Sequence, residues 1–254
     1  MWLLCAAVTA ETPAIIAIHP SGDTLPANHL KFYLHFPEPM RQGVFLKHCR
    51  LLDDRQKPVV EPFRETELWS EDGRRLTLWL HPGRQKTGVN FNEEFGPVLQ
   101  PHRRYTLVIS GKWPSERGAP LGRDVEKSFR TGERITQQLD VAAWHVVPPP
   151  AGTSQPLKIH FPSPLDHALL GRCLRVVDAT DAPVAGTVSI ADDEQTWRFT
   201  PGQPWTAAGY RVLADAILED LAGNSLARPF EVDLQAAPPK QTPRVVAVSF
   251  ECRH

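Results

Sequence analysis

One unit of roughly 100 residues appears twice in this sequence. Residues 36–40, FPEPM, return as residues 161–165, FPSPL, and the match runs without a gap to residues 50–53 (RLLD) and 175–178 (RVVD). Solenoid repeats are shorter, about 20–50 residues, so this period indicates duplicated domains. The chain is therefore expected to fold as two similar units, each able to bury a core of its own.

Within each unit the apolar residues recur with a period of two. Residues 30–36, LKFYLHF, place an apolar side chain at every second position, and residues 157–161, LKIHF, repeat the pattern. This alternation is typical of strands with one face in a core and one in solvent. The 25 prolines favour short strands joined by fixed turns, because proline interrupts helices and central strands. The pattern predicts an all-β chain of two β-sandwiches.

Some segments resemble a known family. Residues 20–23 (PSGD), followed by a strand and by residues 36–40, are similar to the bacterial Ig-like domain of S-layer proteins and other surface proteins. Residues 218–224, LEDLAGN, match that family's most specific motif, whereas residues 111–122 of the first unit lack its Asp-x-x-Gly-Asn turn. The resemblance covers nearly all of residues 11–233. It implies a seven-stranded immunoglobulin-like sandwich, export, and a role in spacing, adhesion or display, with no catalytic residue.

The expected fold is thus two tandem immunoglobulin-like β-sandwich domains plus a C-terminal strand. The expected divisions are residues 1–10 as a signal-peptide remnant, 11–133 as Ig-like domain 1, 134–142 as linker, 143–235 as Ig-like domain 2, and 236–254 as a Pro-rich turn and terminal strand. That strand is expected to join one of the sheets. The alternative is that it opens a third domain.

The first ten residues, MWLLCAAVTA, are similar to the end of a signal peptide, with small residues before a cleavage point at Glu11. The alternative is a buried first strand. A lipid anchor at Cys5 is disfavoured, because Leu4 is too large for the residue before a lipidated cysteine. We therefore expect a secreted, periplasmic or cell-surface protein.

Charge and motifs exclude several function classes. The formal net charge is −1, from 28 basic and 29 acidic residues, so no nucleic-acid partner is expected. The composition predicts no membrane span, and the standard hydrolase, metalloprotease and nucleotide-binding signatures are missing from the sequence. We expect no catalytic residue and no cofactor.

The histidines and the Asp220 turn are weighed as metal ligands. His35 and His160 hold equivalent positions on the outward phase of their strands, where we expect them to be solvated, and nothing in the histidine spacing requires a metal. Asp220, Gly223 and Asn224 suit a tight turn, and with Glu219 they offer too few oxygens for calcium. We therefore predict no metal site.

Four aromatic residues are candidate ligand-binding positions: Tyr33, Trp79, Phe91 and Phe95. Tyr33 and Trp79 fall on the outward phase of their strands, where an exposed ring can stack on a sugar or anchor a protein. The alternative is that both rings pack against the linker, the terminal strand or domain two. Phe91 and Phe95 belong to a connection that is longer in the first unit than in the second.

Two further features predict structure rather than function. Tyr105 and Tyr210 hold matched places near the start of a late strand and suit the tyrosine corner, in which the hydroxyl hydrogen-bonds back across a loop. In the ungapped repeat, Cys49 and Cys173 have opposite strand phase, so Cys49 should face its core and Cys173 should face outward. No disulfide should join the domains.

The sequence therefore favours an exported, non-catalytic binding, adhesion or scaffold module whose partner is another protein or a cell-surface polymer. The alternative is a carbohydrate-active or metal-dependent enzyme with its site at the domain junction. Three carboxylates or histidines that converge in a deep cleft would favour the enzyme. A smooth junction sealed by apolar contacts would favour the scaffold.

Overall fold

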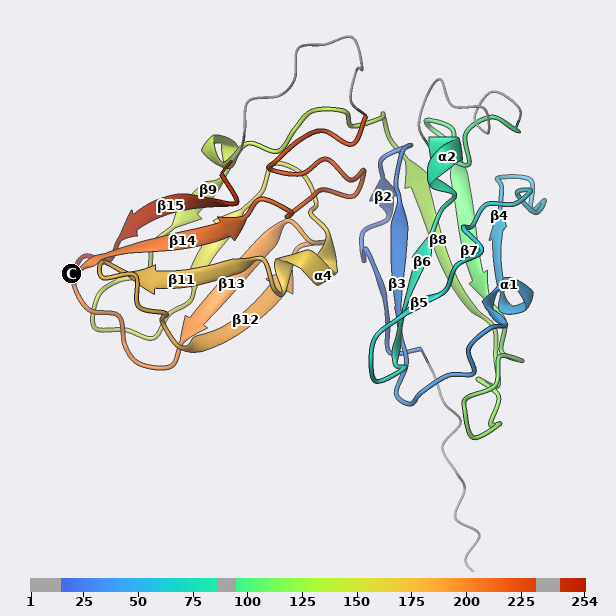
Figure 1. The fold of residues 1–254 in the computed structure, drawn as a ribbon, viewed down its shortest axis with the longest axis horizontal. Coiled ribbons are helices and arrows are strands. Elements are labelled where there is room, and N and C mark those ends of the chain that lie inside the picture. The colour runs from blue at the N-terminus through green and yellow to red at the C-terminus, as the bar shows by residue number, and fades with distance from the viewer. Residues whose placement is uncertain (1–14, 86–94, 232–242) are drawn as a thin grey trace, which may run out of the picture.

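Two β-sandwiches lie side by side in the computed structural model, which describes residues 15–85, 95–231 and 243–254 (Figure 1). The expected signal-peptide remnant and Phe91 lie outside these ranges. Domain one contains β1 to β8 and domain two contains β9 to β15. Among the described residues, none of the helices has the length and apolar character needed to cross a bilayer.

Domain one has two four-stranded sheets. One sheet has the strand order β1 (Ala17–His19), β3 (Lys31–His35), β6 (Arg75–Trp79), β5 (Leu68–Trp69). The other has the order β2 (Thr24–Leu25), β8 (Val125–Thr131), β7 (Arg104–Ile109), β4 (Cys49–Leu52). Two single-turn helices, α1 (Phe45–His48) and α2 (Pro82–Gln85), lie in the connections.

Domain two repeats this layout with a four-stranded and a three-stranded sheet. The orders are β12 (Gly186–Ala191), β13 (Thr196–Pro201), β10 (Leu157–His160), β9 (His145–Val147), and β11 (Leu174–Asp178), β14 (Gly209–Asp215), β15 (Val245–Glu251). In chain order these are the A-B-E-D and C-F-G sheets of an immunoglobulin constant-type domain. Domain two and the segment before it also contain η1 (Val141–Ala143) and α4 (His167–Leu170).

The C-terminal strand is therefore the seventh strand of domain two. It pairs antiparallel with β14 from Gly209↔Glu251 to Asp215↔Val245. Phe250 is 6% exposed and stacks on Tyr210 across this pair, as Phe129 stacks on Tyr105 between β8 and β7 in domain one. The buried face of β15 thus completes the core of domain two.

The tyrosine corners are confirmed in both domains. The Tyr105 hydroxyl accepts the Gln100 backbone N–H at 2.9 Å, and the Tyr210 hydroxyl accepts that of Thr206 at 3.2 Å. Each bond spans the bend that leads into a late strand, so both tyrosines have a structural role.

The turn that appeared to distinguish the domains is present in both. Asp220 donates its N–H to Asn224 O at 2.9 Å, and Ser115 donates to Ala119 O at 2.7 Å. Gly223 and Gly118 hold the same left-handed backbone conformation in the two turns, with φ of +82° and +87°. Residues 115–119 therefore form the same backbone turn as the Asp-x-x-Gly-Asn segment of domain two, with Ser115 in place of the Asp.

Cys49 is buried in the core of domain one, as predicted, but the outward placement of Cys173 was wrong. Cys173 is 1% exposed and packs in the core of domain two. Its N–H donates to Leu169 O at 2.7 Å, so it continues the α4 turn and precedes β11. Strand alternation does not extend to that position. Cys49, Cys173 and Cys252 are all free thiols.

Candidate functional site at the domain junction

The outer face of β3 is covered by domain two, and this corrects the prediction that it faces solvent. Lys31 and Tyr33 are only 7% and 5% exposed, and His35 is half-buried. Figure 1 shows why: β3 stands at the edge of domain one nearest to domain two, and α4 is the helix that approaches it. Ionisable and hydrogen-bonding side chains cluster at this junction.

A buried ionic cluster joins the two domains. Lys31 Nζ lies 2.9 Å from Asp166 Oδ2 and also binds the Glu219 carboxylate. The Tyr33 hydroxyl donates to both oxygens of Asp166, at 2.9 and 2.7 Å. Asp166 also accepts the Leu169 N–H as the N-cap of α4. One carboxylate thus connects β3 of domain one to α4 of domain two.

Lys31 stays charged in spite of its burial. Burial by itself would lower the pKa of Lys31, but the Asp166 and Glu219 carboxylates raise it above its usual value. The Lys31 Nζ also lies 4.9 Å from the centre of the Trp79 ring and 6.0 Å from that of Tyr33. Removing one partner of a buried ion pair costs about 3–5 kcal/mol, because the other charge is left uncompensated.

An apolar contact closes the junction beside this cluster. Leu221, in the turn after Asp220, is 4% exposed and packs within the core of domain one. Its carbonyl accepts the Leu30 N–H at 3.0 Å. A β-carbon on Gly223 would lie 2.5 Å from Leu30 Cδ1, so any other residue there would displace the Leu30 side chain.

The linker is held from both sides. Asn28 of domain one makes two hydrogen bonds with the backbone of Ile135, at 2.7 and 2.9 Å. The Asn224 amide of domain two donates to the same Ile135 carbonyl at 3.0 Å. Asn224 therefore contributes to the junction as well as to its own turn.

A second polar cluster lies at the same junction. His19 of β1, His167 of α4 and Glu194, from the turn between β12 and β13, place one potential metal-ligand atom each within 4.8 Å of one another. His19 Nδ1 lies 2.8 Å and His167 Nδ1 3.2 Å from Glu194 Oε1. The two imidazole rings stack with centroids 3.4 Å apart and planes 17° apart.

Glu194 is ionised and oriented within this cluster. Burial would raise the pKa of the Glu194 carboxyl, but hydrogen bonds from His167, His19 and the Ser21 N–H outweigh burial and lower the pKa to about 2. The Ser21 N–H donates to Glu194 Oε2 at 2.9 Å. The backbone of Glu194 is left-handed, with φ +64°.

His35 completes the group of histidines. Its ring centre lies 5.5 Å from that of His19 and 6.3 Å from that of His167. Burial and the two neighbouring histidines lower the pKa of His35 to about 4, so it is neutral near pH 7. Its buried Nε2 makes no hydrogen bond with any residue that the structure describes.

The aromatic candidates separate in the structure. Tyr33 and Trp79 flank Lys31 from neighbouring strands, and Tyr33 packs against domain two, which was the alternative considered for it. Phe95 is 42% exposed, and its carbonyl accepts a hydrogen bond from Arg84. His160, the counterpart of His35 in domain two, is partly buried, and its Nδ1 forms a hydrogen bond with the Thr196 hydroxyl at 2.9 Å.

Both carboxylate oxygens of Asp220 accept hydrogen bonds from within its own turn. Asp220 Oδ1 accepts the N–H groups of Ala222 and Asn224, and Oδ2 accepts the Asn224 amide. Glu219, which was weighed with it for calcium, binds Lys31. Burial raises the pKa of Asp220 to about 6. These contacts confirm the tight turn predicted from the sequence.

Sequence reasoning missed Asp166, His167, His19 and Glu194. The ungapped repeat aligns Asp166 and His167 with Arg41 and Gln42, so these are positions where the two copies differ in chemistry. Such differences within an otherwise repeated segment are the sequence signal that could have identified Asp166 and His167 as candidate site residues.

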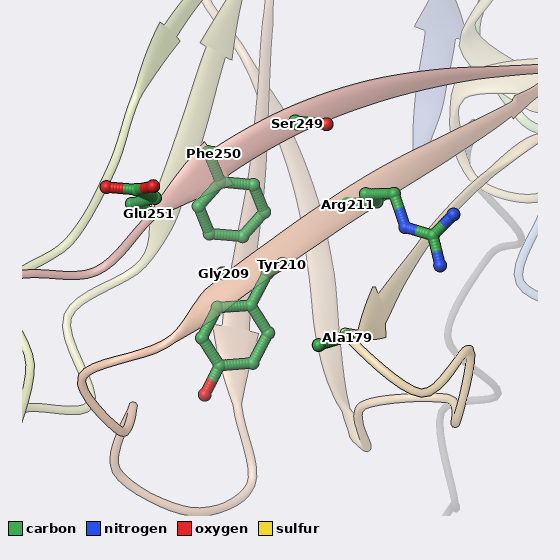
Figure 2. Close-up of a pocket in the computed structure, with 7 residues that line it drawn as sticks. All are labelled: Ala179, Gly209, Tyr210, Arg211, Ser249, Phe250 and Glu251. Atoms are coloured by element: carbon green, nitrogen blue, oxygen red, sulfur yellow. The ribbon is translucent and has the colours of Figure 1, made fainter.

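A hollow of about 480 Å³ lies far from the junction, over the ends of β14 and β15 (Figure 2). Figure 2 shows its lining, which consists of Ala179, Gly209, Tyr210, Arg211, Ser249, Phe250 and Glu251. The Arg211 guanidinium is paired with Asp181, and the two rings belong to the core. The lining therefore holds no cluster comparable to those at the junction.

Comparison with known proteins gives likenesses of fold only. No family model and no curated protein matches the chain. Domains 1–6 of the surface layer protein SbsC are 12% identical over 81% of this chain and 24% of that one, with a TM-score of 0.36. The N-terminal part of the bacterial S-layer protein SbsC is 13% identical over 80% and 40%, with a TM-score of 0.34.

Native alpha-2-macroglobulin from Escherichia coli, spanning domains MG0-NIE-MG1, is 10% identical over 95% of this chain and 72% of that chain, with a TM-score of 0.32. The chain spans less than half the length of the two SbsC structures. The immunoglobulin-like fold itself is established by the strand order of the two sandwiches.

Proposed function

We propose that this chain is an exported, non-catalytic, two-domain Ig-like protein that acts as a binding, adhesion or scaffold module with its two sandwiches at a fixed angle. Its partner is another protein or a cell-surface polymer. The observation that carries this proposal is the ionic cluster of Lys31, Asp166 and Glu219, buried between the domains. The expected domain boundaries, at residues 133 and 143, are part of the same proposal.

The junction supports a fixed angle because its contacts depend on one arrangement of the domains. Relative motion is the usual state of tandem domains that share a small polar interface. Here separation would leave Lys31 and Asp166 without their partners and would withdraw Leu221 from the core of domain one. A spacer or display module needs such a link, since a fixed angle sets where each domain presents its surface.

A small cavity between the two domains supports the scaffold over the enzyme. The cavity next to Leu221 and Asp193 has a volume of about 230 Å³. Pockets that bind small molecules commonly measure about 300–1,000 Å³. The histidine–glutamate cluster is the observation that favours the alternative of a metal-dependent enzyme, but its side chains pack against one another beside a small cavity.

Export and the S-layer type of Ig-like domain remain part of the proposal. They are supported by the leader-like residues 1–10 and by the motif at residues 218–224. Fractionation of the source cells, with an antibody against the folded protein, tests export. Recovery in the cytoplasmic fraction alone would contradict it.

The fixed angle is tested with two spin labels, one on each domain. Lys47 and Thr187 are exposed, and K47C/T187C in a C5S background provides the labelling sites. We expect a single narrow distance distribution by pulsed electron paramagnetic resonance. Lys31→Met should broaden it, because the Asp166 and Glu219 carboxylates lose their buried counter-charge.

Arg175→Ala is the matched control for Lys31→Met. Arg175 forms an ion pair with Asp215 at 2.8 Å on the surface of domain two, with the Arg175 side chain 48% exposed. Its loss should leave the distribution narrow, because exposed ion pairs contribute little. A broad distribution in the unmodified protein would refute the proposed fixed angle.

A further inference from the structure

We propose that His19, His167 and Glu194 form a zinc site that connects the two domains. The three ligand atoms come from three segments: His19 from β1 of domain one, His167 from α4, and Glu194 from the turn between β12 and β13. Two imidazole nitrogens and one carboxylate oxygen are a donor set that Zn²⁺ prefers. The site goes beyond the proposed scaffold role and does not depend on it.

The spacing of the ligand atoms is close to that of a tetrahedral zinc site. Tetrahedral zinc with bonds of about 2.0–2.1 Å places its ligand atoms about 3.4 Å apart. The distances from Glu194 Oε1 to His19 Nδ1 and His167 Nδ1 are 2.8 and 3.2 Å. One potential ligand atom from each of the three residues lies within 4.8 Å of the other two. The two imidazole rings stack with planes 17° apart, so one ring must turn about its side-chain torsions to direct its nitrogen lone pair at a shared ion.

The Glu194 carboxylate is oriented by Ser21, a residue of domain one. The Ser21 N–H donates to both oxygens of Glu194, at 2.9 Å to Oε2 and 3.1 Å to Oε1, and Oε1 also faces the imidazoles. The Ser21 hydroxyl bonds to Asp193 Oδ1 and Glu194 Oε1, both at 3.1 Å. Groups that orient a ligand in this way are characteristic of protein metal sites.

The backbone gives an independent indication that Glu194 is placed for its side chain. Leu165 donates its N–H to Glu194 O at 3.1 Å, and in domain one Met40 donates to Gly73 O at 3.2 Å. Gly73 and Glu194 thus hold one position of the repeat, with φ of +66° and +64°. A left-handed position that suits glycine carries a buried glutamate only in domain two, where its carboxylate reaches His19.

The fourth coordination position has a candidate in His35. Its ring is perpendicular to that of His19 at 5.5 Å, and its buried Nε2 has no hydrogen-bond partner among the described residues. Rotation of the His35 side chain, or one water molecule, would complete a tetrahedron. Asp193, next to Glu194, adds negative charge that favours a cation.

The test uses the full-length protein, stripped of metal with EDTA and dialysed, and then titrated with ZnCl₂ by calorimetry. We expect one zinc ion per chain and a rise in melting temperature, since an ion bound only to the native state stabilises it. Substitution with Co²⁺ should give the visible absorption of a tetrahedral site. Absence of stoichiometric binding, or a Co²⁺ spectrum typical of six oxygen ligands, would overturn the proposal.

The variants H167A and E194Q test the ligands. E194Q keeps the shape of Glu194, and circular dichroism verifies that each variant is folded. Both should weaken zinc binding by more than about tenfold, since even groups that only orient a ligand change affinity by about 10–100-fold. H35A should weaken binding only if His35 is the fourth ligand, and its cobalt spectrum separates a histidine from a water there.

The matched control is H102A. His102 forms another His–Glu pair, at 2.8 Å from Glu133, but on the surface of domain one, where the side chains are 68% and 79% exposed. H102A should bind zinc like the unmodified protein. Equal loss in H102A and H167A, or unchanged binding in H167A and E194Q, would place the zinc elsewhere and refute the site.

Discussion

Glu194 of domain two stands where domain one has Gly73, and both residues hold the same left-handed backbone conformation. Each carbonyl accepts the N–H of the residue that follows the repeated Phe-Pro-x-Pro segment, Leu165 in one domain and Met40 in the other. The carboxylate of Glu194 lies at the domain junction and accepts hydrogen bonds from Ser21 and His19. One position of a duplicated turn has thus been adapted to hold the two copies together.

The first prediction separates the side chain of Glu194 from its backbone. Both Glu194→Gly and Glu194→Ala remove the carboxylate, but only alanine keeps a β-carbon at φ +64°. Metal-free E194G should therefore be more stable than E194A by about 1 kcal/mol, measured by urea unfolding. Equal stabilities would mean that the left-handed conformation costs nothing at this position.

The second prediction compares two glycines in equivalent turns. Gly118→Ala and Gly223→Ala both place a β-carbon at a positive φ, which costs about 1 kcal/mol. The new carbon meets nothing within 4 Å at Gly118, but at Gly223 it lies 2.5 Å from Leu30 Cδ1. G223A should therefore unfold at clearly lower urea concentration than G118A. It should also broaden the interdomain distance distribution.

If G223A and G118A have the same urea midpoint and the same distance distribution, Leu221 and its turn do not pack against domain one. A G118A protein that shows a broader distance distribution would point to a general loosening of the fold. Circular dichroism of both variants at equal concentration provides the check that each retains its β structure.

The third prediction concerns pH. Burial, with the negative charge of Glu219 adding, raises the pKa of Asp220 to about 6 against the hydrogen bonds from Asn224 and Ala222. An unfolded Asp titrates near pH 3.9, so between about pH 4 and 6 the folded state binds more protons. The free energy of unfolding should fall as pH rises through this window, by up to about 3 kcal/mol from Asp220.

Asp220→Asn should remove that decline, measured by urea unfolding at several pH values from 4 to 7. Asp178→Asn is the control: hydrogen bonds from Thr180 lower the pKa of this exposed carboxyl, so its contribution has the opposite sign and is lost as pH falls. A D220N protein with the same pH dependence as the unmodified protein would contradict the assignment of the decline to Asp220.

The fourth prediction concerns the thiols. Burial raises the pKa of Cys49, Cys173 and Cys252, which keeps them protonated and inaccessible. In a C5S variant, a thiol reagent should react with none of them in the folded protein and with all three after denaturation. Rapid reaction of one thiol under native conditions would contradict its burial, and a Cys49–Cys173 bridge by mass spectrometry would contradict the fold.

The fifth prediction concerns the C-terminal strand. Phe250→Ala should lower the free energy of unfolding of domain two by about 3–5 kcal/mol, because the ring is buried against Tyr210. Phe129→Ala, the counterpart in domain one, should destabilise domain one instead. Hydrogen exchange followed by mass spectrometry assigns each effect to a domain. Unchanged exchange in β14 of F250A would mean that β15 does not complete that sheet.

The sequence alone determined the duplication, the β class and the strand faces of each core. It also determined the tyrosine corners and the Asp220 turn. These features depend on periodicity, matched positions and local turn chemistry, which are properties of neighbouring residues in the chain. Alternation places Leu34 and Leu78 in the core whatever lies outside it, because a strand has only two faces.

Only the tertiary structure decided what covers the outward face of β3. Periodicity placed Lys31, Tyr33 and His35 on the outward face of β3, since one sandwich by itself leaves that side of the strand open. Docking of domain two buried them, and it joined His19 to Glu194, which are 175 positions apart. No local pattern encodes such a contact, because it depends on the angle between two folded domains and on the few residues where the copies differ.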